Sequence, residues 1–215
     1  MKKGLTELVV ILDASGSMHD LTSDTIGGFN SLIDEQRKKE GEVLVSVVTF
    51  NETSKVIYDR VPLAEVKKMT TKDYMANGCT ALIDAIGDAT HHISNVHKYI
   101  REEDRPENTL FVITTDGMEN SSHKYSSDEV KKMVKAKEEL GWEFLFIGAN
   151  IDAIETAKGL GIDERNAVDY CADVAGTGVV FESVSHALFK KRDGLILKEM
   201  AWSDDIKDDY ESRKK

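Results

Sequence analysis

Short apolar runs recur along the chain, and most are rich in β-branched and aromatic residues. The runs are LVVIL (8–12), VLVSVVTF (43–50), TLFVITT (109–115) and WEFLFIGA (142–149). Three of the four are almost continuously apolar, which is typical of parallel strands covered on both faces. The shorter segment AVDYCA (167–172) predicts a last strand.

Segments with helical spacing follow most of these runs. Ile26, Phe29 and Ile33 repeat at helical spacing, and the polar stretch after them ends at Gly41. A capping-box pattern at Ser126 predicts the start of one later helix. Asp152, as an N-cap, predicts the start of another. The remaining helices are expected in 82–93 and in VVFESVSHALFKK (179–191).

The order of these elements predicts the fold class. The turn-like string NETSK (51–55) joins the second run to KVIYDRV (55–61), so that KVIYDRV is expected to be an antiparallel edge strand. Elsewhere strands and helices alternate, which predicts a doubly wound α/β fold. We expect a mostly parallel six-stranded sheet with helices on both faces, forming a single domain over residues 1–202. The stretch 203–215 is expected to be a charged C-terminal tail.

Composition and charge narrow the class of partner. With 40% hydrophobic residues among 215, the chain can build a sizeable core. A net charge of −11 disfavours nucleic acid and an anionic membrane surface as partners. No stretch is long enough to span a bilayer, and the first residues do not form a signal peptide. Cys79 and Cys171 make no disulfide framework, so we expect a cytoplasmic protein.

Three groups of oxygen-bearing side chains lie next to the ends of predicted strands and helices. Asp13, Ser15 and Ser17 follow the first strand, Thr80 stands before a helix, and Asp116 closes the strand 109–115. Functional loops of doubly wound sheets collect at the carboxyl ends of the strands, so these clusters are expected to converge. Three hydroxyls and two carboxylates with no soft ligand fit Mg²⁺ or Mn²⁺.

The same residues resemble the motifs of the von Willebrand factor A (vWA) domain. DASGS (13–17) resembles its D-x-S-x-S signature, GCTAL (78–82) its G-G-T-x-L element, and TTDG (114–117) its T-D-G element. The resemblance covers residues 5–192 and extends to small stand-alone bacterial and phage members. It differs at Cys79, where the family commonly has a second glycine.

The resemblance implies a Rossmann-like vWA fold with a metal ion-dependent adhesion site. Ser15, Ser17 and Thr80 would bind the cation directly, Asp13 and Asp116 would act mainly through water, and a carboxylate from a partner protein would complete the shell. Neutral inner ligands leave a cation short of negative charge, which favours one more anionic ligand. We therefore predict a metal-dependent protein-interaction module rather than an enzyme.

The surroundings of these motifs are expected to form the rim of a partner-binding surface, because adaptable methionines beside polar and aromatic groups suit protein contacts. The rim residues are Met18, His19, Met75, Asn77, Met118, Asn120, His123 and Tyr125.

Other interpretations remain open from the sequence. Asp13 and Ser17 are also suited to cap the next helix, as is Thr80. A metal-dependent phosphotransfer enzyme would use Asp13 as the phosphoryl acceptor, but it needs an acid where Ser15 stands and a lysine near Asp116. A third interpretation is a structural subunit whose metal only supports the fold. Cys79 is expected to be inert, although its place beside the motif leaves a reactive thiol open.

Overall fold

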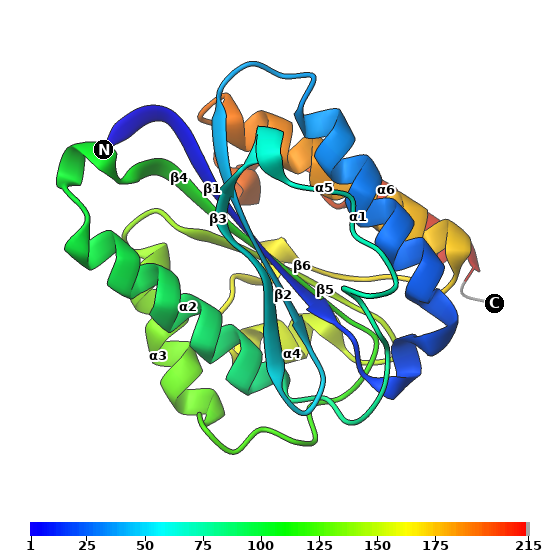
Figure 1. The fold of residues 1–215 in the computed structure, drawn as a ribbon. Helices are drawn as coiled ribbons and strands as arrows, with labels where there is room; N and C mark the ends of the chain where they lie inside the picture. The colour runs from blue at the N-terminus through cyan, green and yellow to red at the C-terminus, as the bar shows by residue number, and fades with distance from the viewer. Residues whose placement is uncertain (214–215) are drawn as a thin grey trace.

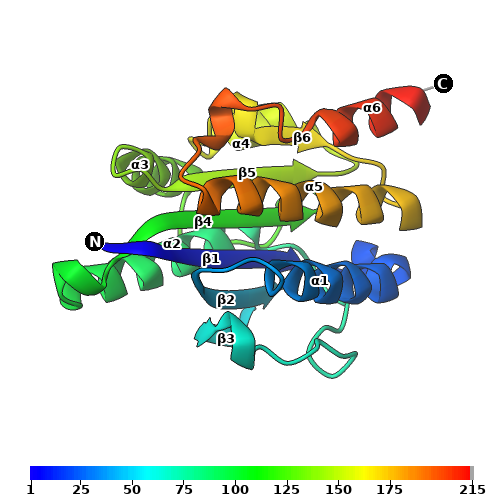
Figure 2. The ribbon, with the colours of Figure 1, turned by 90° about the horizontal axis from the view of Figure 1, so that it is seen from above.

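A six-stranded sheet lies between two layers of helices in the computed structural model, which describes residues 1–213 (Figures 1 and 2). The strand order is β3-β2-β1-β4-β5-β6, and only the β2–β3 pair is antiparallel. The strands are β1 (Lys2–Asp13), β2 (Glu42–Phe50), β3 (Ser54–Pro62), β4 (Pro106–Thr115), β5 (Glu143–Gly148) and β6 (Ala167–Asp169). The predicted fold class is confirmed, including the antiparallel edge strand.

The helices divide between the two faces of the sheet (Figure 2). One face carries α1 (Thr22–Gln36), α5 (Val174–Arg192) and α6 (Asp204–Arg213), and the other carries α2 (Leu82–Tyr99), α3 (Ser127–Glu138) and α4 (Ala153–Gly159). Short 3₁₀ turns are η1 (Gly16–Leu21), η2 (Leu63–Glu65), η3 (Glu102–Asp104), η4 (Glu164–Asn166) and η5 (Leu197–Glu199). The capping box at Ser126 and the N-cap at Asp152 are confirmed. Within residues 1–213, no helix combines the length and apolar character needed to cross a membrane.

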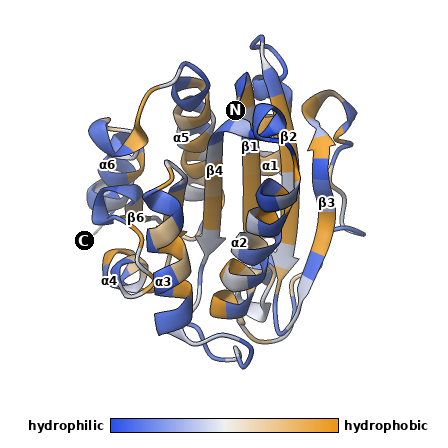
Figure 3. Ribbon diagram, turned by 90° about the vertical axis from the view of Figure 1, so that its left-hand side faces the viewer, coloured by the Kyte–Doolittle hydropathy of each residue, from blue (hydrophilic) through white to orange (hydrophobic). Residues whose placement is uncertain are grey.

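Alternation along the central strands builds a separate core on each face. In β1, Leu8, Val10 and Leu12 pack with α1 and α5, while Val9 and Ile11 pack with α2, α3 and α4. The strands are accordingly the most hydrophobic elements in Figure 3, between helices with polar outer sides. Because the central strands are buried on both faces, their sequences are nearly continuous in apolar character.

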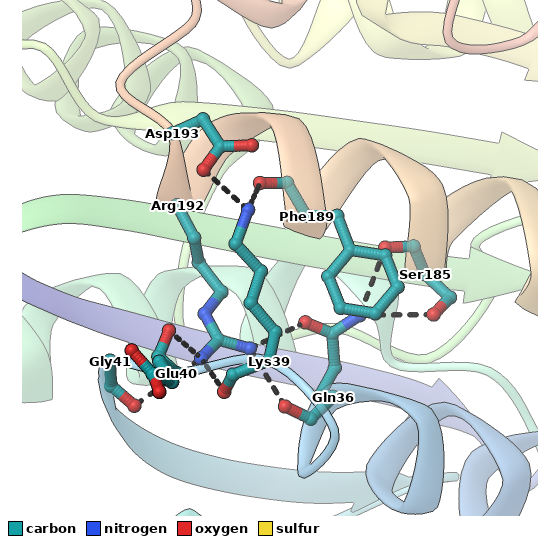
Figure 4. Close-up of polar contacts among 8 residues, drawn as sticks. All are labelled: Gln36, Lys39, Glu40, Gly41, Ser185, Phe189, Arg192 and Asp193. Atoms are coloured by element: carbon teal, nitrogen blue, oxygen red, sulfur yellow. Dashed lines mark hydrogen bonds and ion pairs between the residues drawn. The ribbon is translucent and has the colours of Figure 1, made fainter.

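A polar cluster joins the C-terminal ends of α1 and α5 (Figure 4). The Arg192 guanidinium donates to the carbonyl oxygens of Gln36 (2.8 Å) and Lys39 (2.7 Å). Gln36 Nε2 donates to the Ser185 carbonyl oxygen at 2.9 Å, and Lys39 Nζ donates to the Phe189 carbonyl oxygen at 2.7 Å. These contacts satisfy carbonyl groups at the end of α1 and hold the helix against α5, at the end remote from the DASGS loop.

Gly28 lets α1 approach α5 closely. A Cβ atom at this position would lie 2.6 Å from Cγ of the buried Phe181, whereas a Cβ at Gly27 would meet no atom within 4 Å. The two adjacent glycines therefore differ in their role: Gly28 is needed for helix packing and Gly27 is not.

Gly28→Ala is expected to lower the free energy of unfolding by about 1–3 kcal/mol, because the added methyl group overpacks the contact with Phe181. Gly27→Ala, the matched control on the exposed side of α1, is expected to raise it by about 0.5–1 kcal/mol through helix propensity. Urea unfolding of both variants measures the difference. Equal effects of the two substitutions would show that the close approach does not constrain residue 28.

The edge strand β3 is irregular. Its pairing with β2 shifts register twice, between Val45 and Val47 and again between Val47 and Val48. Arg60 has a φ of 51°, a left-handed conformation that is unusual for a residue other than glycine. Its N–H donates to Ser46 Oγ at 3.0 Å instead of to a strand carbonyl. The strand is therefore bent near its C-terminal end, and Pro62 closes it.

The stretch expected to form a charged tail continues the packed structure. It forms helix α6, in which Ile206 is buried in the same core as Trp202. Arg213 Nη1 pairs with Asp173 at 2.6 Å, which ties α6 to the start of α5. Residues 214–215 of the predicted tail lie outside the described residues. The last predicted strand is shorter than expected and ends at Asp169.

Candidate functional site

Asp13 closes β1 and is held between two neighbouring segments. Its Oδ1 accepts the N–H of Ser15 at 2.7 Å, and its Oδ2 accepts the Thr115 hydroxyl at 2.6 Å. Thr115 closes β4, the strand that pairs with β1. The N-cap of the following 3₁₀ turn is Ser15, and no side chain caps it. Neither Asp13 nor Ser17 therefore acts as the cap of the next helical segment.

The structure brings the five predicted site residues together from three loops. Ser15 Oγ lies 3.1 Å from Ser17 Oγ, and Ser17 Oγ donates a short hydrogen bond to Asp116 Oδ1. A Cβ added to Gly117 would lie 3.4 Å from Ser17 Oγ and 3.6 Å from Thr80 Oγ1, so both hydroxyls lie next to this glycine. We call Asp13, Ser15, Ser17, Thr80 and Asp116 the oxygen cluster. Their role as metal ligands stays a prediction.

Backbone hydrogen bonds fix the loops relative to one another. Gly16 N–H donates to the Gly78 carbonyl at 3.0 Å. Thr80 N–H donates to Asn120 Oδ1 at 2.9 Å, and Asn120 N–H returns to the Thr80 carbonyl at 3.0 Å. The N-cap of α2 is Ala81, without a side-chain cap, so the Thr80 hydroxyl is not used to cap this helix. The loops are thus positioned by backbone N–H and carbonyl groups and by Asn120, while the hydroxyls of Ser15 and Ser17 contact one another and Asp116.

Cys79, which stands where the vWA motif commonly has a second glycine, leaves the loop intact. Gly78, with a φ of +75°, adopts the left-handed conformation that the turn requires, whereas Cys79 does not. Cys79 is exposed, and its N–H donates to Glu52 Oε1 at 3.3 Å. A side chain at position 79 therefore meets no backbone conflict.

Asp84 organises the third loop rather than the oxygen cluster. Its carboxylate accepts the N–H groups of His123 (2.9 Å), Lys124 (3.0 Å) and Tyr125 (2.9 Å). Burial alone would raise the pKa of Asp84, but these hydrogen bonds lower it below the usual range. Asp84 thus holds the loop after Asp116 against the start of α2.

The two carboxylates of the cluster are buried without a cationic partner. Asp13 is 0% exposed and Asp116 5% exposed. Burial raises the pKa of both carboxyl groups, hydrogen bonds from Ser15 and Ser17 oppose this, and the charge of Asp13 raises that of Asp116 further. Among residues 1–213, neither carboxylate pairs with Lys, Arg or His. A divalent cation would balance this unpaired charge.

The donor set fits a hard cation. In the described part of the chain, no group of three or more His, Cys, Asp or Glu side chains is placed to hold a metal ion. A cation at the cluster would therefore depend on the serine and threonine hydroxyls beside the two carboxylates. Such oxygen ligands suit Mg²⁺ and Mn²⁺ better than metals that prefer sulfur or nitrogen.

Most of the predicted rim residues lie on the surface. His19, Met75, Asn77, Met118, Asn120 and His123 are exposed. Tyr125 is half-buried and packs against the core on the α2 side. Met18 is only 2% exposed and belongs to the opposite core, because the turn η1 directs it inward together with Leu21. Including Met18 in the rim was therefore wrong.

Two residues that support the cluster are absent from the predicted site. Thr115 binds Asp13, and the buried Tyr74 donates a short hydrogen bond from its hydroxyl to the Asp13 carbonyl oxygen. Thr115 directly precedes Asp116 in the TTDG motif, so its position gives a usable signal. Tyr74 lies in a segment without helical or strand periodicity, and nothing local indicates its contact with residue 13.

No protein-family model matches the sequence, and no curated protein is similar to it by sequence. Solved structures do match the fold. The vWF domain of the type V pili tip protein Mfa5 from Porphyromonas gingivalis has a TM-score of 0.62 at 10% identity. A von Willebrand factor type A structure from Catenulispora acidiphila has a TM-score of 0.58 at 16% identity. Proximal thread matrix protein 1 from the mussel byssus has a TM-score of 0.61 at 11% identity. In that structure zinc occupies the metal ion-dependent adhesion site (MIDAS) motif.

These matches cover 86% of this chain in each case. The chain spans 95% of the Mfa5 domain, but only 48% of the mussel protein and 42% of the Catenulispora protein. At such identities the similarity establishes the fold and leaves the function to be argued from the site.

Proposed function

We propose that this chain, which has the fold of a von Willebrand factor type A domain, is a metal-dependent protein-interaction module. The observation that carries the proposal is the pair of buried carboxylates, Asp13 and Asp116, which have no cationic partner within residues 1–213 and contact Ser15 and Ser17. The zinc-occupied MIDAS motif of the mussel protein supports a divalent cation in a domain of this fold. We expect Mg²⁺ or Mn²⁺ here.

The residues of the cluster divide into two roles. Ser15, Ser17 and Thr80 would hold the cation directly, and Asp13 and Asp116 would act through water. When bound, the cation supplies a local positive charge that attracts a further anionic ligand. We propose that an aspartate or glutamate of a partner protein is that ligand.

The exposure of the cluster indicates how a partner approaches. Ser17 is exposed, whereas Asp13 and Asp116 are buried beneath it. Met75 and Met118, both exposed, come from the two loops that flank Thr80 and Asp116 in sequence. We propose that they give adaptable apolar contacts around the partner's carboxylate. Because the chain carries a net charge of −11, an acidic partner is repelled at long range, and binding depends on the cation.

Binding is favoured over phosphotransfer. Both oxygens of the Asp13 carboxylate accept hydrogen bonds, and the side chain has no exposed surface for an in-line attack on a phosphoryl group. Ser15 stands where a phosphotransfer enzyme needs a second acid. Lys124, a lysine in the loop after Asp116, is paired with Asp88.

The free thiols of Cys79 and Cys171 are in keeping with the cytoplasm, which we propose as the location of the protein.

The test is a pull-down with the immobilised protein in Mg²⁺ and in EDTA, followed by alanine scanning of the acidic residues of the captured partner. We expect capture to require the cation, and Thr80→Val or Ser17→Ala to weaken it about tenfold or more, as expected when a metal site loses a ligand. Asp20→Asn is the matched control, because its side chain is exposed beside the cluster and, among residues 1–213, bonds only to His19.

Three outcomes would contradict the proposal. Capture that persists in EDTA excludes a metal-dependent contact. A captured partner in which no single carboxylate matters excludes the proposed ligand. Cation-dependent turnover of p-nitrophenyl phosphate that Asp13→Asn abolishes would favour the enzyme instead.

A further inference from the structure

A cavity lies at the opposite end of the sheet from the oxygen cluster. It measures about 600 Å³ and is formed where α2 and α3 end and where β4 and β5 begin. Its lining includes Lys98 from α2, Arg105 before β4, Lys137 from α3 and Trp142 before β5. Three basic side chains thus surround one space in a chain that is otherwise acidic.

In the described part of the chain these three cations have no acidic partner. Within residues 1–213, none of Lys98, Arg105 and Lys137 belongs to an ion pair. Lys98 Nζ lies 5.2 Å from the centre of the Tyr99 ring, and Lys137 Nζ lies 5.3 Å from that of Trp142. Arg105 Nε is buried and has no hydrogen-bond partner in the part of the chain that is described.

Helix electrostatics account for part of this arrangement. Lys98 and Lys137 stand in the last turns of α2 and α3, where cations complement the helix dipole. Arg105 follows η3 and precedes β4, and no long helix ends there. Its place at the cavity is therefore not explained by a helix dipole, and its buried Nε–H has no acceptor among residues 1–213.

Two acidic residues, Glu102 and Glu107, also line the cavity. Glu107 Oε2 accepts the N–H of Gly4 at 2.7 Å, so this carboxylate contacts β1 rather than a basic side chain. Glu102 accepts the Arg105 N–H at 3.2 Å through its backbone carbonyl. Lys98, Arg105 and Lys137 outnumber these two acidic residues in the lining.

We propose that this cavity binds a small organic phosphate. A guanidinium offers directional donors to phosphate oxygens, and two lysines supply the further charge that a dianion requires. A volume of about 600 Å³ falls in the range of small-molecule sites. The exposed Leu140 and the indole of Trp142 give apolar surface for the organic part. The site is independent of the oxygen cluster and of any metal bound there.

Trp142 provides a direct readout, since the chain has only two tryptophans. In a Trp202→Phe background, the fluorescence of Trp142 is titrated with glycerol 3-phosphate, phenyl phosphate and inorganic phosphate, in EDTA and at constant ionic strength. We expect saturable changes, with the organic phosphates binding more tightly than inorganic phosphate. Calorimetry on the unmodified chain should give the same order.

Lys137→Gln and Lys98→Gln are expected to weaken binding about tenfold each, as is Arg105→Gln if it folds. Lys135→Gln is the matched control, because Lys135 is exposed on α3 and does not line the cavity. Thr80→Val should leave phosphate binding unchanged, which separates this site from the proposed metal site. The absence of saturation at millimolar concentrations, or equal binding by the two lysine variants and the control, would overturn the proposal.

Discussion

Replacing Arg60 by methionine is expected to lower the free energy of unfolding by about 3–5 kcal/mol. Arg60 Nε donates to Glu7 Oε1 at 2.7 Å, and His97 Nε2 lies 2.9 Å from Glu7 Oε2. Glu7 is 0% exposed on β1, so removal of the guanidinium leaves a buried carboxylate with a single partner. Methionine keeps an unbranched side chain at position 60, and it is no better suited than arginine to the left-handed φ there, so the substitution tests the loss of the guanidinium. Urea unfolding near neutral pH measures the loss.

An exposed ion pair gives the matched control. Lys2 Nζ pairs with Glu42 at 2.7 Å, but both side chains are well exposed, so Lys2→Met should cost less than about 1 kcal/mol. Combining Arg60→Met with Glu7→Leu should recover part of the loss, because no uncompensated charge then remains buried. If Arg60→Met costs no more than Lys2→Met, the buried pair does not stabilise the sheet as argued.

Thr80→Val and Asp13→Asn are expected to remove the stabilisation that Mg²⁺ gives to the protein. For the unmodified chain we expect this stabilisation to be about 2.7 kcal/mol at a hundredfold excess of free cation over its Kd. Valine matches the shape of threonine but lacks the hydroxyl, and asparagine keeps the size of Asp13 without its charge. Thermal melts in Mg²⁺ and in EDTA measure the difference, and calorimetry measures binding itself.

The behaviour without metal gives the control for this experiment. In EDTA, Asp13→Asn should be about as stable as the unmodified chain, because it removes a buried charge that opposes ionisation of Asp116. Unchanged Mg²⁺ binding in both variants would contradict the assignment of the cluster. A large loss of stability in EDTA for Asp13→Asn would contradict the view that the two carboxylates oppose one another.

The fold follows from local sequence where burial on both faces demands it. The run 8–12 is unmistakable because every residue in it packs into a core. The start of β1 at Lys2 is not predictable in this way, because it depends on a distant contact: Lys2 N–H donates to the Arg105 carbonyl at 2.7 Å. The charged sequence of α6 predicts a tail, because a single apolar residue such as Ile206 gives too weak a pattern to indicate that the helix packs.

In the candidate site too, the sequence indicates residues in local motifs and not residues that meet only in the folded chain. Short motifs indicate the oxygen cluster, because its side chains occupy a few adjacent positions in each loop. These residues are Asp13, Ser15, Ser17, Thr80 and Asp116. Met18 was misplaced because a polar neighbourhood in sequence does not reveal which way a 3₁₀ turn directs each side chain. Tyr74 was missed because it reaches residue 13 only through the folded chain.

The bend in β3 has a consequence for how molecules of this protein meet one another. A straight edge strand offers a row of free amide and carbonyl groups to any other extended chain, and this is a common route to aggregation. Here two register shifts, an inward-pointing Arg60 and the terminal Pro62 interrupt that row. The hydrogen bonds that distort the strand around Ser46 and Glu7 therefore also make it a poor template for fibril growth.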